Sequence, residues 1–439
     1  MTFLRDVSYN FTKQVTMLFC GLVSSVVVSR VLGPTDRGVL ALVMLIPSML
    51  LLFGDLGIPF ANVYFLGKKR VRPRDVAFNS LVIGLLVGSL LALGSILLLP
   101  IIGSYVAPGV PVTYSIIAIS VLPFSLAVGF LASILVGLQK IREACIITMI
   151  ISVGSTAGTV FVLLELNGGV EGLLILSLIT GIAVFVFFVA YIKKVAGYSR
   201  HISQTYVRES ANYGSKAYLA NALNFFNRKL SYFILGYFLG ALDVGYFAVA
   251  IGLAEMIWII PSTVSFVLFP SVASTDSTSA GDLTAMSCRF VFFVSTTICV
   301  AAAALGGIAI HILYGDPFAP SYLPLVLLLP GILLASTGSL TSSYLAGIGK
   351  VIYAPIIDGT GLLVAIILNL LLIPSFGIVG ASIATSICYA YTGLLGVHFF
   401  RKHSELDLRE VYLVKRSDIS ILIRRVLNVT IKDQNRPKT

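Results

Sequence analysis

Long apolar runs separated by short polar segments make up most of the chain. About a dozen of these runs are close to the ~20 residues that a helix needs to cross ~30 Å of hydrocarbon. We place the predicted spans at residues 14–32, 38–65, 76–99, 112–137, 144–164, 170–192, 213–239, 244–270, 288–313, 321–347, 352–373 and 379–400. The pattern predicts an all-α polytopic membrane protein with about 12 transmembrane helices, and an even number of spans puts both termini on one side.

The positive charges indicate which side that is. Most of the 30 Lys and Arg residues lie in the N-terminus, the even-numbered loops and the tail, and Arg37 is the one cation in the odd-numbered loops. Loops rich in Lys and Arg stay in the cytosol. We therefore expect both termini to be cytosolic and the protein to lie in the plasma (inner) membrane.

Composition excludes several classes of protein. With 57% apolar and only 11% charged residues, the chain is not a soluble protein. The net charge of +11 does not indicate nucleic-acid binding, because no segment between spans is long enough to form a folded basic surface. Nor is there room for a nucleotide-binding domain or any GxxxxGK[ST] motif, so we expect no coupling to ATP by this chain alone.

Residue patterns typical of catalytic or metal sites are missing from the sequence. The five cysteines are scattered mostly inside apolar runs without CxxC spacing, which indicates packing residues. The sequence has no HExxH, GxSxG, paired-carboxylate or histidine-cluster arrangement. We therefore predict no catalytic residues, no metal site and no bound cofactor, and we do not expect an enzyme.

An internal repeat divides the chain into two halves. Three motifs recur at offsets of 207, 210 and 208 residues: LGPTDRGVLA (Leu32–Ala41) with LGALDVGYFA (Leu239–Ala248), LVGLQKI (Leu135–Ile141) with LAGIGKV (Leu345–Val351), and GVEG (Gly169–Gly172) with GIVG (Gly377–Gly380). Six helices separate equivalent points, so the halves enter the membrane in the same orientation. This predicts two parallel six-helix bundles that enclose a cleft at their interface, where substrate sites of such transporters lie.

The repeat also sets the expected domain boundaries. We assign an N-terminal six-helix bundle to residues 1–192, a basic cytosolic linker to 193–212, a C-terminal six-helix bundle to 213–400 and a basic cytosolic tail to 401–439. In the tail, Leu408, Val411 and Tyr412 begin an apolar pattern near helical spacing that extends to Val426. This predicts a basic helix on the inner leaflet, and a solvated tail is the alternative.

Ionisable residues inside the spans are the main candidates for function, because each costs about 2.5–3.5 kcal/mol on insertion scales. They are Arg30, Asp55, Lys216, Arg228, Lys229, Glu255 and Asp358. Lys216 lies close to the cytosolic end and is set aside. Of the other six, only Asp358 lies outside the first two helices of each half, so we expect those four helices to line the interior. Four cations against three carboxylates favour an anionic substrate, and the arginine fork suits phosphate or pyrophosphate.

Depth along the helices indicates which of these charges meet. Arg228 lies 11 residues before Leu239 and Glu255 lies 11 residues after Val244, so both are about 16 Å from the outer ends of their helices. An ion pair of Glu255 with Arg228 or Lys229 and a direct contact with substrate or ion both stay open. Arg30 is three residues from the outer end of its helix, which suits either snorkelling or an anion contact.

Helix breaks accompany two of the carboxylates. The segment FGDLGIPF surrounds Asp55 with glycines and Pro59, and Pro261 follows Glu255 by six residues. We expect both helices to bend or loosen there, either as ordinary proline kinks or as hinges for gating. Asp358 is a further candidate for ion coupling.

Several stretches resemble the polysaccharide flippases of the multidrug/oligosaccharidyl-lipid/polysaccharide exporter superfamily. They are Ser29–Leu42, Gly54–Arg70, Asn227–Ser274, Leu345–Lys350 and Leu368–Tyr389, in the order and spacing of that family. The resemblance implies a V-shaped pair of bundles that moves a polyprenyl-pyrophosphate-linked oligosaccharide from the inner to the outer leaflet by alternating access. Related lipid II flippases carry two helices that this chain lacks, so that branch is less expected.

The resemblance also bears on individual residues. Arg30 matches the common arginine of the family's first helix, and Arg228 falls in its helix-7 segment, where an aspartate often follows three residues later. This chain has Ser231 at that position, so an acidic partner on helix 7 is not carried over.

We therefore predict a flippase for cell-surface polysaccharide biosynthesis. Arg30, Arg228 and Lys229 are its candidate substrate-binding residues, and Asp55, Glu255 and Asp358 are its candidate gating or coupling residues. Expected partners are the lipid-linked oligosaccharide, membrane lipids and glycan-assembly enzymes, with sodium, protons or the membrane potential as the driving force. The alternative is a cation-coupled multidrug exporter of small organic cations.

Overall fold

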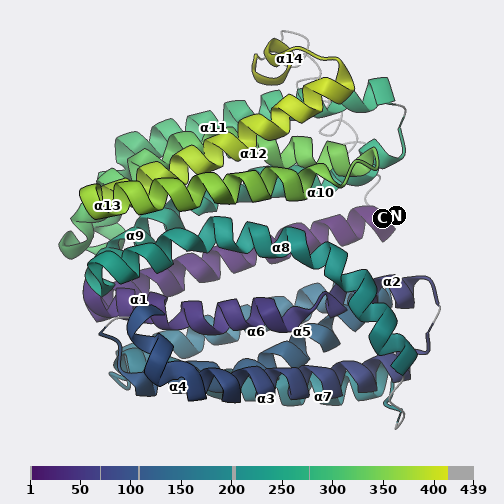
Figure 1. The fold of residues 1–439 in the computed structure, drawn as a ribbon, viewed down its shortest axis with the longest axis vertical. Coiled ribbons are helices and arrows are strands. Elements are labelled where there is room, and N and C mark those ends of the chain that lie inside the picture. Colours follow the sequence, from purple (N-terminus) through teal and green to yellow (C-terminus); the bar gives the residue numbers. More distant parts are fainter. Residues whose placement is uncertain (1, 70, 107–108, 200–203, 276, 414–439) are drawn as a thin grey trace, which may run out of the picture.

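The computed structural model describes residues 2–69, 71–106, 109–199, 204–275 and 277–413. Helices form the described part of the chain (Figure 1). Their bounds are α1 (Thr2–Asp55), α2 (Ile58–Gly67), α3 (Pro73–Val106), α4 (Val112–Ser120), α5 (Leu122–Gly137), α6 (Ile141–Leu164), α7 (Gly169–Val195), α8 (Gln204–Leu239), α9 (Ala241–Glu255), η1 (Met256–Trp258), α10 (Ile259–Ala273), α11 (Ser277–Tyr314), η2 (Asp316–Ser321), α12 (Tyr322–Gly347), α13 (Tyr353–Ser404) and α14 (Leu408–Tyr412).

The predicted all-α membrane fold is confirmed. Within the described residues, nine helical segments are long and apolar enough to cross a membrane. Two of them, α1 and α13, are each divided by one glycine with non-helical angles, Gly33 and Gly377, and so supply two passages apiece. The polar helix α8 adds the twelfth predicted passage, and its asparagines, Arg228 and Lys229 explain its low hydropathy.

Backbone geometry reproduces the sequence repeat. Left-handed residues occur at equivalent places in both halves: Gly33 (φ 74°) with Gly240 (φ 84°), Gln139 (φ 60°) with Gly349 (φ 80°), and Gly169 with Gly377 (φ 57° each). These pairs are 207, 210 and 208 residues apart, the same offsets as in the motifs. All six residues mark the ends or kinks of helices. Five of them are glycines, which have no Cβ and adopt positive φ angles at little cost.

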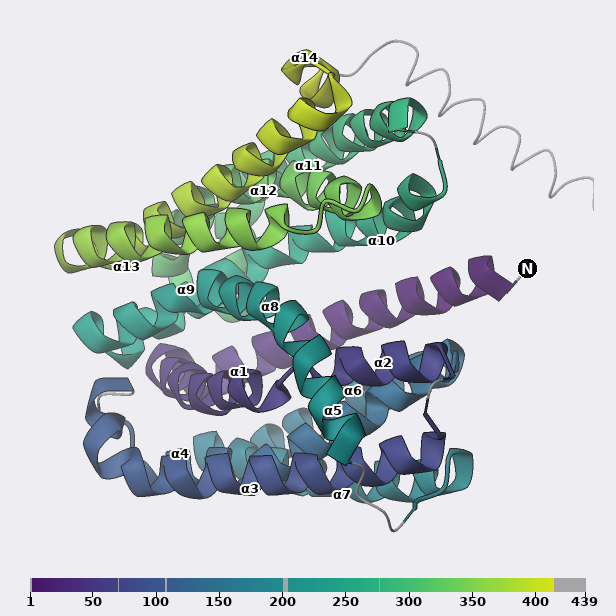
Figure 2. The same cartoon turned by 45° about the vertical axis from the view of Figure 1, so that its right-hand side comes forward.

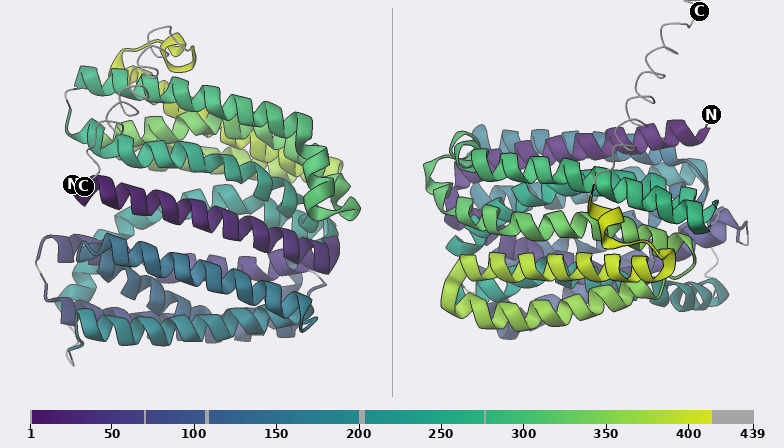
Figure 3. Two further views of the ribbon diagram at one scale, coloured as in Figure 1. Left: turned by 180° about the vertical axis from the view of Figure 1, so that it is seen from behind. Right: turned by 90° about the horizontal axis from the view of Figure 1, so that it is seen from above.

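The helices form two lobes joined by α8 (Figures 1 and 2). The N-terminal lobe contains α1–α7, the C-terminal lobe contains α9–α14, and α8 crosses from the first to the second. We call the end that carries Gly33, Gly240 and Gly377 the kink end, and the opposite end, with the start of α1, the basic end. Seen from behind, the first part of α1 runs between the lobes (Figure 3).

Packing joins the lobes at the kink end. One apolar cluster there combines Leu42 and Leu45 of α1 with residues of α8, α9, α11, α12 and α13. Toward the basic end, each lobe has its own cluster, around Leu131 in the N-terminal lobe and around Tyr344 in the C-terminal lobe. The structure is therefore closed at the kink end.

Two glycines of the repeated LGxxDxGxxA motif bring the backbones of the two lobes into direct contact. A Cβ on Gly38 would lie 1.7 Å from the Ala241 carbonyl oxygen, and one on Gly245 would lie 2.0 Å from the Pro34 carbonyl oxygen. Since ordinary Cβ contacts are at 3.4 Å or more, only glycine permits this approach. The repeat thus supplies matched surfaces where α1 and α9 meet.

The helix α8 begins inside the segment that we predicted as a linker. It is helical from Gln204 onward, and Tyr206 is buried in the N-terminal lobe with its ring 6.3 Å from that of Phe65. The Tyr206 hydroxyl donates a hydrogen bond to Oδ1 of the fully buried Asn62, whose Nδ2 donates to Ser80 Oγ at 3.0 Å. The first turn of α8 is therefore anchored to the N-terminal lobe although the rest of the helix belongs to the other lobe.

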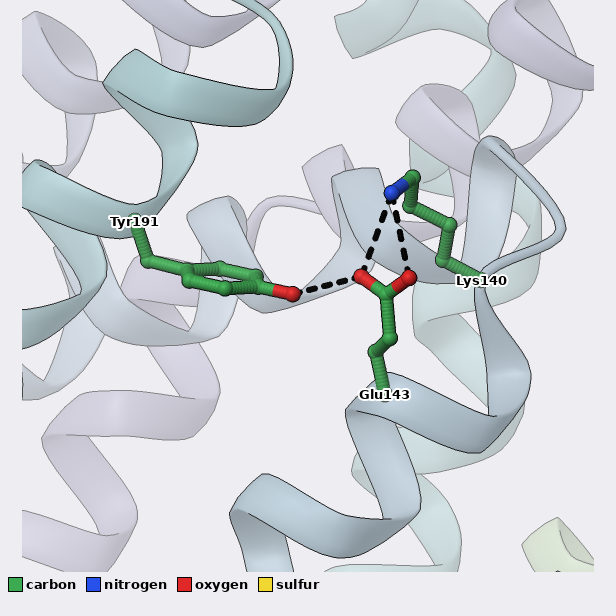
Figure 4. A network of polar contacts seen from close by, with 3 residues as sticks. All are labelled: Lys140, Glu143 and Tyr191. Carbon is green, nitrogen blue, oxygen red and sulfur yellow. Dashed lines mark hydrogen bonds and ion pairs between the residues drawn. The ribbon is translucent and has the colours of Figure 1, made fainter.

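A polar network orders the basic end of the N-terminal lobe (Figure 4). Lys140 Nζ lies 3.1 Å from Glu143 Oε1, and the Tyr191 hydroxyl donates to Glu143 Oε2 at 2.5 Å. The Arg142 guanidinium lies 5.3 Å from the centre of the Tyr9 ring, which connects the start of α1. Because Lys140 and Glu143 are each 38% exposed, the pair is worth at most about 1 kcal/mol and serves mainly to position the helix ends.

The predicted tail helix is only partly visible. The last transmembrane helix extends to residue 404, beyond the predicted boundary, and α14 then packs on α11, with the rings of Tyr412 and Phe292 4.9 Å apart. Arg289 Nη1 lies 3.7 Å from Glu410 Oε2. The start of the tail thus packs on the C-terminal lobe, and the rest of the predicted basic helix, in residues 414–439, lies outside the described residues.

Candidate functional site

A cavity of about 390 Å³ lies within the C-terminal lobe. Segments of α8, η1, α10, α12 and α13 line it. Hydroxyl and amide side chains supply much of its wall, namely Asn224, Asn227, Ser339, Ser342, Ser343 and Thr392. Arg228, Asp358, Trp258 and Tyr389 add charge and aromatic surface. Such a lining can bind a polar ligand with many hydroxyl groups.

Arg228 is the central cation of this cavity. Its Nη1 lies 3.7 Å from Glu255 Oε1, and its guanidinium carbon lies 4.2 Å from the centre of the Trp258 ring. The Arg228 and Glu255 side chains remain 32% and 26% exposed. Of the two pairings with Glu255 that depth along the helices left open, the structure shows the one with Arg228.

The guanidinium retains capacity for a further ligand. Its Nε is buried and has no hydrogen-bond partner among the described residues. A single ion-pair contact at 3.7 Å also leaves most of its five N–H donors without a carboxylate. Arg228 can therefore bind an additional acceptor in the cavity.

A helix break places Glu255 and Trp258 beside Arg228. The helix α9 ends at Glu255, and the residues Met256–Trp258 form a turn of 3₁₀ helix before α10 begins. Pro261 explains the break, because it has no N–H to bond the carbonyl four residues earlier. This confirms the predicted interruption of the helix. Tyr389 completes the cluster, since its hydroxyl donates to Glu255 Oε1 at 3.3 Å.

Asp358 faces the same cavity from α13. The Asn227 side chain donates to the Asp358 backbone carbonyl at 2.9 Å, which ties α8 to α13 at this depth. The structure thus brings three of the predicted residues together, Arg228, Glu255 and Asp358. The local charge is one cation between two carboxylates, which differs from the slightly positive interior that we predicted from counting.

Lys229 points away from this cavity. Its Nζ lies 5.0 Å from the centre of the Tyr232 ring, on the next turn of α8. It is within electrostatic range of Glu255, Arg228 and Arg37. Consecutive residues on a helix point in directions about 100° apart, so Lys229 faces the interface between the lobes rather than the pocket.

The two candidates from the first helices lie elsewhere. Arg30 is exposed at the kink end, where Nε donates to the Leu313 carbonyl at 2.8 Å and Nη2 donates to the Ile312 carbonyl at the end of α11. An arginine is favourable there because the last carbonyls of a helix carry partial negative charge. Asp55 ends α1 and accepts a hydrogen bond from the Gly57 N–H at 3.1 Å. The break that we predicted around Asp55 is confirmed.

Sequence reasoning missed several residues of the site. Trp258 and Tyr389 were not among the candidate residues, although the single tryptophan lies three residues after Glu255, on the same helix face. Asn224 lies one helical turn before Arg228 and Asn227 directly precedes it, and both line the cavity from α8. A polar side chain within one turn of a charge inside a predicted span is the sequence signal that could have identified the two asparagines.

Comparisons with known proteins agree with this architecture. A family model described as "Polysaccharide biosynthesis protein" matches residues 27–323. The "Uncharacterized membrane protein YabM" of Bacillus subtilis (strain 168) is 33% identical over 96 residues. That region is 22% of this chain and 18% of YabM, so the alignment spans less than a fifth of the relative's length.

Solved structures show the same fold at low sequence identity. The lipid II flippase MurJ in its inward closed conformation superposes with a TM-score of 0.72 at 16% identity, over 95% of this chain and 92% of MurJ. An inward-facing multidrug resistance transporter of the MATE family in the MOP superfamily gives 0.64 at 17% identity, over 91% and 94% of the two chains. These likenesses establish the fold.

Proposed function

The chain belongs to the polysaccharide biosynthesis protein family, in the multidrug/oligosaccharidyl-lipid/polysaccharide exporter superfamily, and from this premise we propose that it flips a lipid-linked oligosaccharide. The substrate in this proposal is a polyprenyl-pyrophosphate-linked oligosaccharide that moves from the inner to the outer leaflet by alternating access. Membership of this family and the structural likeness to the lipid II flippase MurJ support a transporter rather than an enzyme.

The observation that carries the proposal is the chemistry of the C-terminal cavity. Arg228 offers unpaired N–H donors for a phosphate oxygen, and the guanidinium lies against Trp258. Hydroxyl and amide side chains around it match the hydroxyl groups of a sugar. In this mechanism the lipid tail stays in the bilayer beside the lobes, and only the polar headgroup enters the protein.

Alternating access is supported by where the lobes meet. The kink end is closed by the Gly38–Gly245 contact and a shared apolar cluster, whereas each lobe keeps its own core toward the basic end. We propose that the basic end faces the cytosol, as the positive charges predict, and that both termini lie there. In that orientation the structure represents a state closed to the outside.

Glu255 and Asp358 are proposed to tune Arg228 during the cycle. An entering pyrophosphate competes with Glu255 for the guanidinium, so the carboxylate weakens substrate binding and allows release. The freed carboxylates are then candidates for binding a sodium ion or a proton, and Asp55 at the α1–α2 break is a candidate for gating. Lys229 and Arg30 are proposed to contact the pyrophosphate only when the kink end opens.

The experiment that tests this function measures the leaflet distribution of lipid-linked oligosaccharides in cells. An impermeant glycan-modifying reagent is applied to intact and to opened cells, with and without the gene. In cells without the protein, one species should stay protected until the cells are opened, and its mass identifies the substrate. An unchanged distribution, with no redundant transporter present, would contradict the proposal.

A variant ties the cellular result to the cavity. Replacing Arg228 with alanine should abolish flipping while protein levels stay normal, because the substituted side chain lies in the cavity rather than in the apolar cores. The matched control is Lys350→Ala, which removes a positive charge from an exposed loop at the basic end. Full activity of R228A would remove Arg228 from the site.

Export of small organic cations is the second candidate, favoured by one observation. Two carboxylates and two aromatic rings surround Arg228, and the Trp258 and Tyr389 ring centres are 5.5 Å apart. Aromatic faces and carboxylates bind organic cations. Efflux of ethidium from loaded vesicles distinguishes the two functions. If the chain is a flippase for anionic lipid headgroups, ethidium efflux should be no faster with the native chain than with R228A.

A further inference from the structure

A second cation of the interior, Arg37, forms no ion pair with any residue that the structure describes. Arg37 lies in α1 one turn beyond the Gly33 kink, and its Nε is buried with no hydrogen-bond partner in the part of the chain that the structure describes. The neighbouring Asp36 is exposed and faces a different direction on the helix. The hydroxyls of Tyr232 and Tyr314 lie close enough to interact with it electrostatically. Leaving the buried Nε of a half-buried guanidinium without an acceptor is costly, so its position calls for a partner.

The Arg37 side chain borders a cavity of its own. This cavity measures about 270 Å³ and lies inside the N-terminal lobe between α1, α6 and α7, separate from the one around Arg228. Ser24, Thr159, Ser177 and Thr180 contribute hydroxyl groups to its wall. Each of these hydroxyls already donates a hydrogen bond, Ser24 to Thr156 Oγ1 and the other three to carbonyls of their own helices. An anion in the cavity would receive them as donors, in addition to the arginine, once they rotate away from those acceptors.

The second half of the internal repeat has no cation at the position equivalent to Arg37. The position equivalent to Arg37 in the second half is Val244, which is completely buried. An aliphatic residue therefore satisfies packing at this point of the fold. The charge at position 37 serves something that the second half lacks.

We propose that Arg37 anchors a second anion site, inside the N-terminal lobe, that binds a phosphate-class oxyanion. The cavity volume is several times the ~30 Å³ share of one water molecule and accommodates an anion of this size. The bound group is either the pyrophosphate of a lipid headgroup on its way to the kink end or a free inorganic anion. Lys229 interacts electrostatically with both Arg228 and Arg37, so the proposed site would lie between the Arg228 cavity and the kink end.

Binding of inorganic pyrophosphate to the purified full-length chain tests the site directly. Thermal unfolding is followed with and without pyrophosphate, because a ligand that binds only the folded state raises the unfolding midpoint. The three variants are Arg37→Met, which keeps the length and loses the charge, Arg37→Lys, which keeps the charge and loses the fork, and the matched control Arg72→Met at an exposed loop position.

The expected pattern has two parts. Without pyrophosphate, R37M should unfold at a higher temperature than the native chain, because an unpartnered charge has been removed. With pyrophosphate, the native chain and R72M should show the full shift. R37K should bind roughly tenfold more weakly at this site, since one good hydrogen bond to a charged group is worth about that factor, and R37M should keep only the smaller shift that the Arg228 cavity contributes. A full pyrophosphate shift in R37M, or no shift in the native chain, would overturn the site.

Transport of the lipid-linked oligosaccharide by R37M then identifies the source of the anion. Loss of flipping assigns the site to the lipid headgroup, and normal flipping with a reduced pyrophosphate shift assigns it to a free anion. Because the binding test involves no transport, it can fail while the flippase proposal stands, and the reverse also holds.

Discussion

The contact between Gly38 and Gly245 makes the conformational equilibrium sensitive to single methyl groups. An alanine Cβ at position 38 would lie 1.7 Å from the Ala241 carbonyl oxygen and 2.9 Å from the Gly245 nitrogen. Both are backbone atoms, so no side-chain rotation relieves the clash. Restoring an ordinary contact requires α1 and α9 to separate by about 1.5–2 Å at the kink end.

The cost of this clash falls on one state only. Overpacking a close contact costs about 1–3 kcal/mol, and here the contact joins the two lobes rather than helices of one lobe. The state open at the kink end therefore gains that amount relative to the closed state. A change of about 1–3 kcal/mol corresponds to a shift of roughly 5–150-fold in the ratio of the two states.

Spin-label distances across the kink end measure the shift. Labels at Leu166→Cys and Leu323→Cys report one exposed position on each lobe, and all five native cysteines are buried. Gly38→Ala should move the distance distribution toward longer separations.

Two matched substitutions control for the loss of a glycine. Gly21→Ala in α1 and Gly252→Ala in α9 add the same methyl group where nothing lies within 4 Å, and they should leave the distribution unchanged. Identical distributions for Gly38→Ala, the controls and the native chain would refute the reasoning.

Three further substitutions have defined outcomes. Glu255→Gln should strengthen pyrophosphate-lipid binding and slow turnover, because Arg228 loses its competing carboxylate; single-turnover and steady-state flipping rates separate the two effects. Trp258→Ala should weaken substrate binding roughly tenfold, since a cation–π contact is worth about 1–2 kcal/mol, as a titration of flipping rate against lipid concentration would show. Tyr206→Phe leaves the buried Asn62 oxygen without its donor and should lower the free energy of unfolding by about 1–3 kcal/mol, measured by denaturation in detergent.

The fold could be predicted from the sequence because lipid imposes a strict length and polarity on every span. Apolar runs gave the number of passages, and the LGxxDxGxxA motif gave the two halves. What the pattern could not give was the pairing of helices across the lobes. The approach of Gly38 to Gly245 depends on the angle at which α1 and α9 cross, which a repeat in one dimension does not specify.

The candidate site was predictable only where depth alone decides a contact. Arg228 and Glu255 share a depth and meet, which is one of the two pairings that depth allowed. Arg30 was read by its helix position, yet its partners are carbonyls of α11, some 280 residues later in the chain. Arg37 was counted as a loop charge because the Gly33 kink restarts the helix earlier than predicted. Its burial follows from tertiary packing and has no signal in the local sequence.

The most direct test of the flippase proposal uses the purified chain in vesicles. A polyprenyl-pyrophosphate-linked oligosaccharide is placed in the inner leaflet of proteoliposomes, and an impermeant glycan-modifying reagent outside reports its arrival in the outer leaflet. The native chain should expose the lipid within minutes, whereas vesicles with R228A should match protein-free vesicles. Equal rates for the native chain and protein-free vesicles, in chains shown to be folded and inserted, would contradict the flippase function.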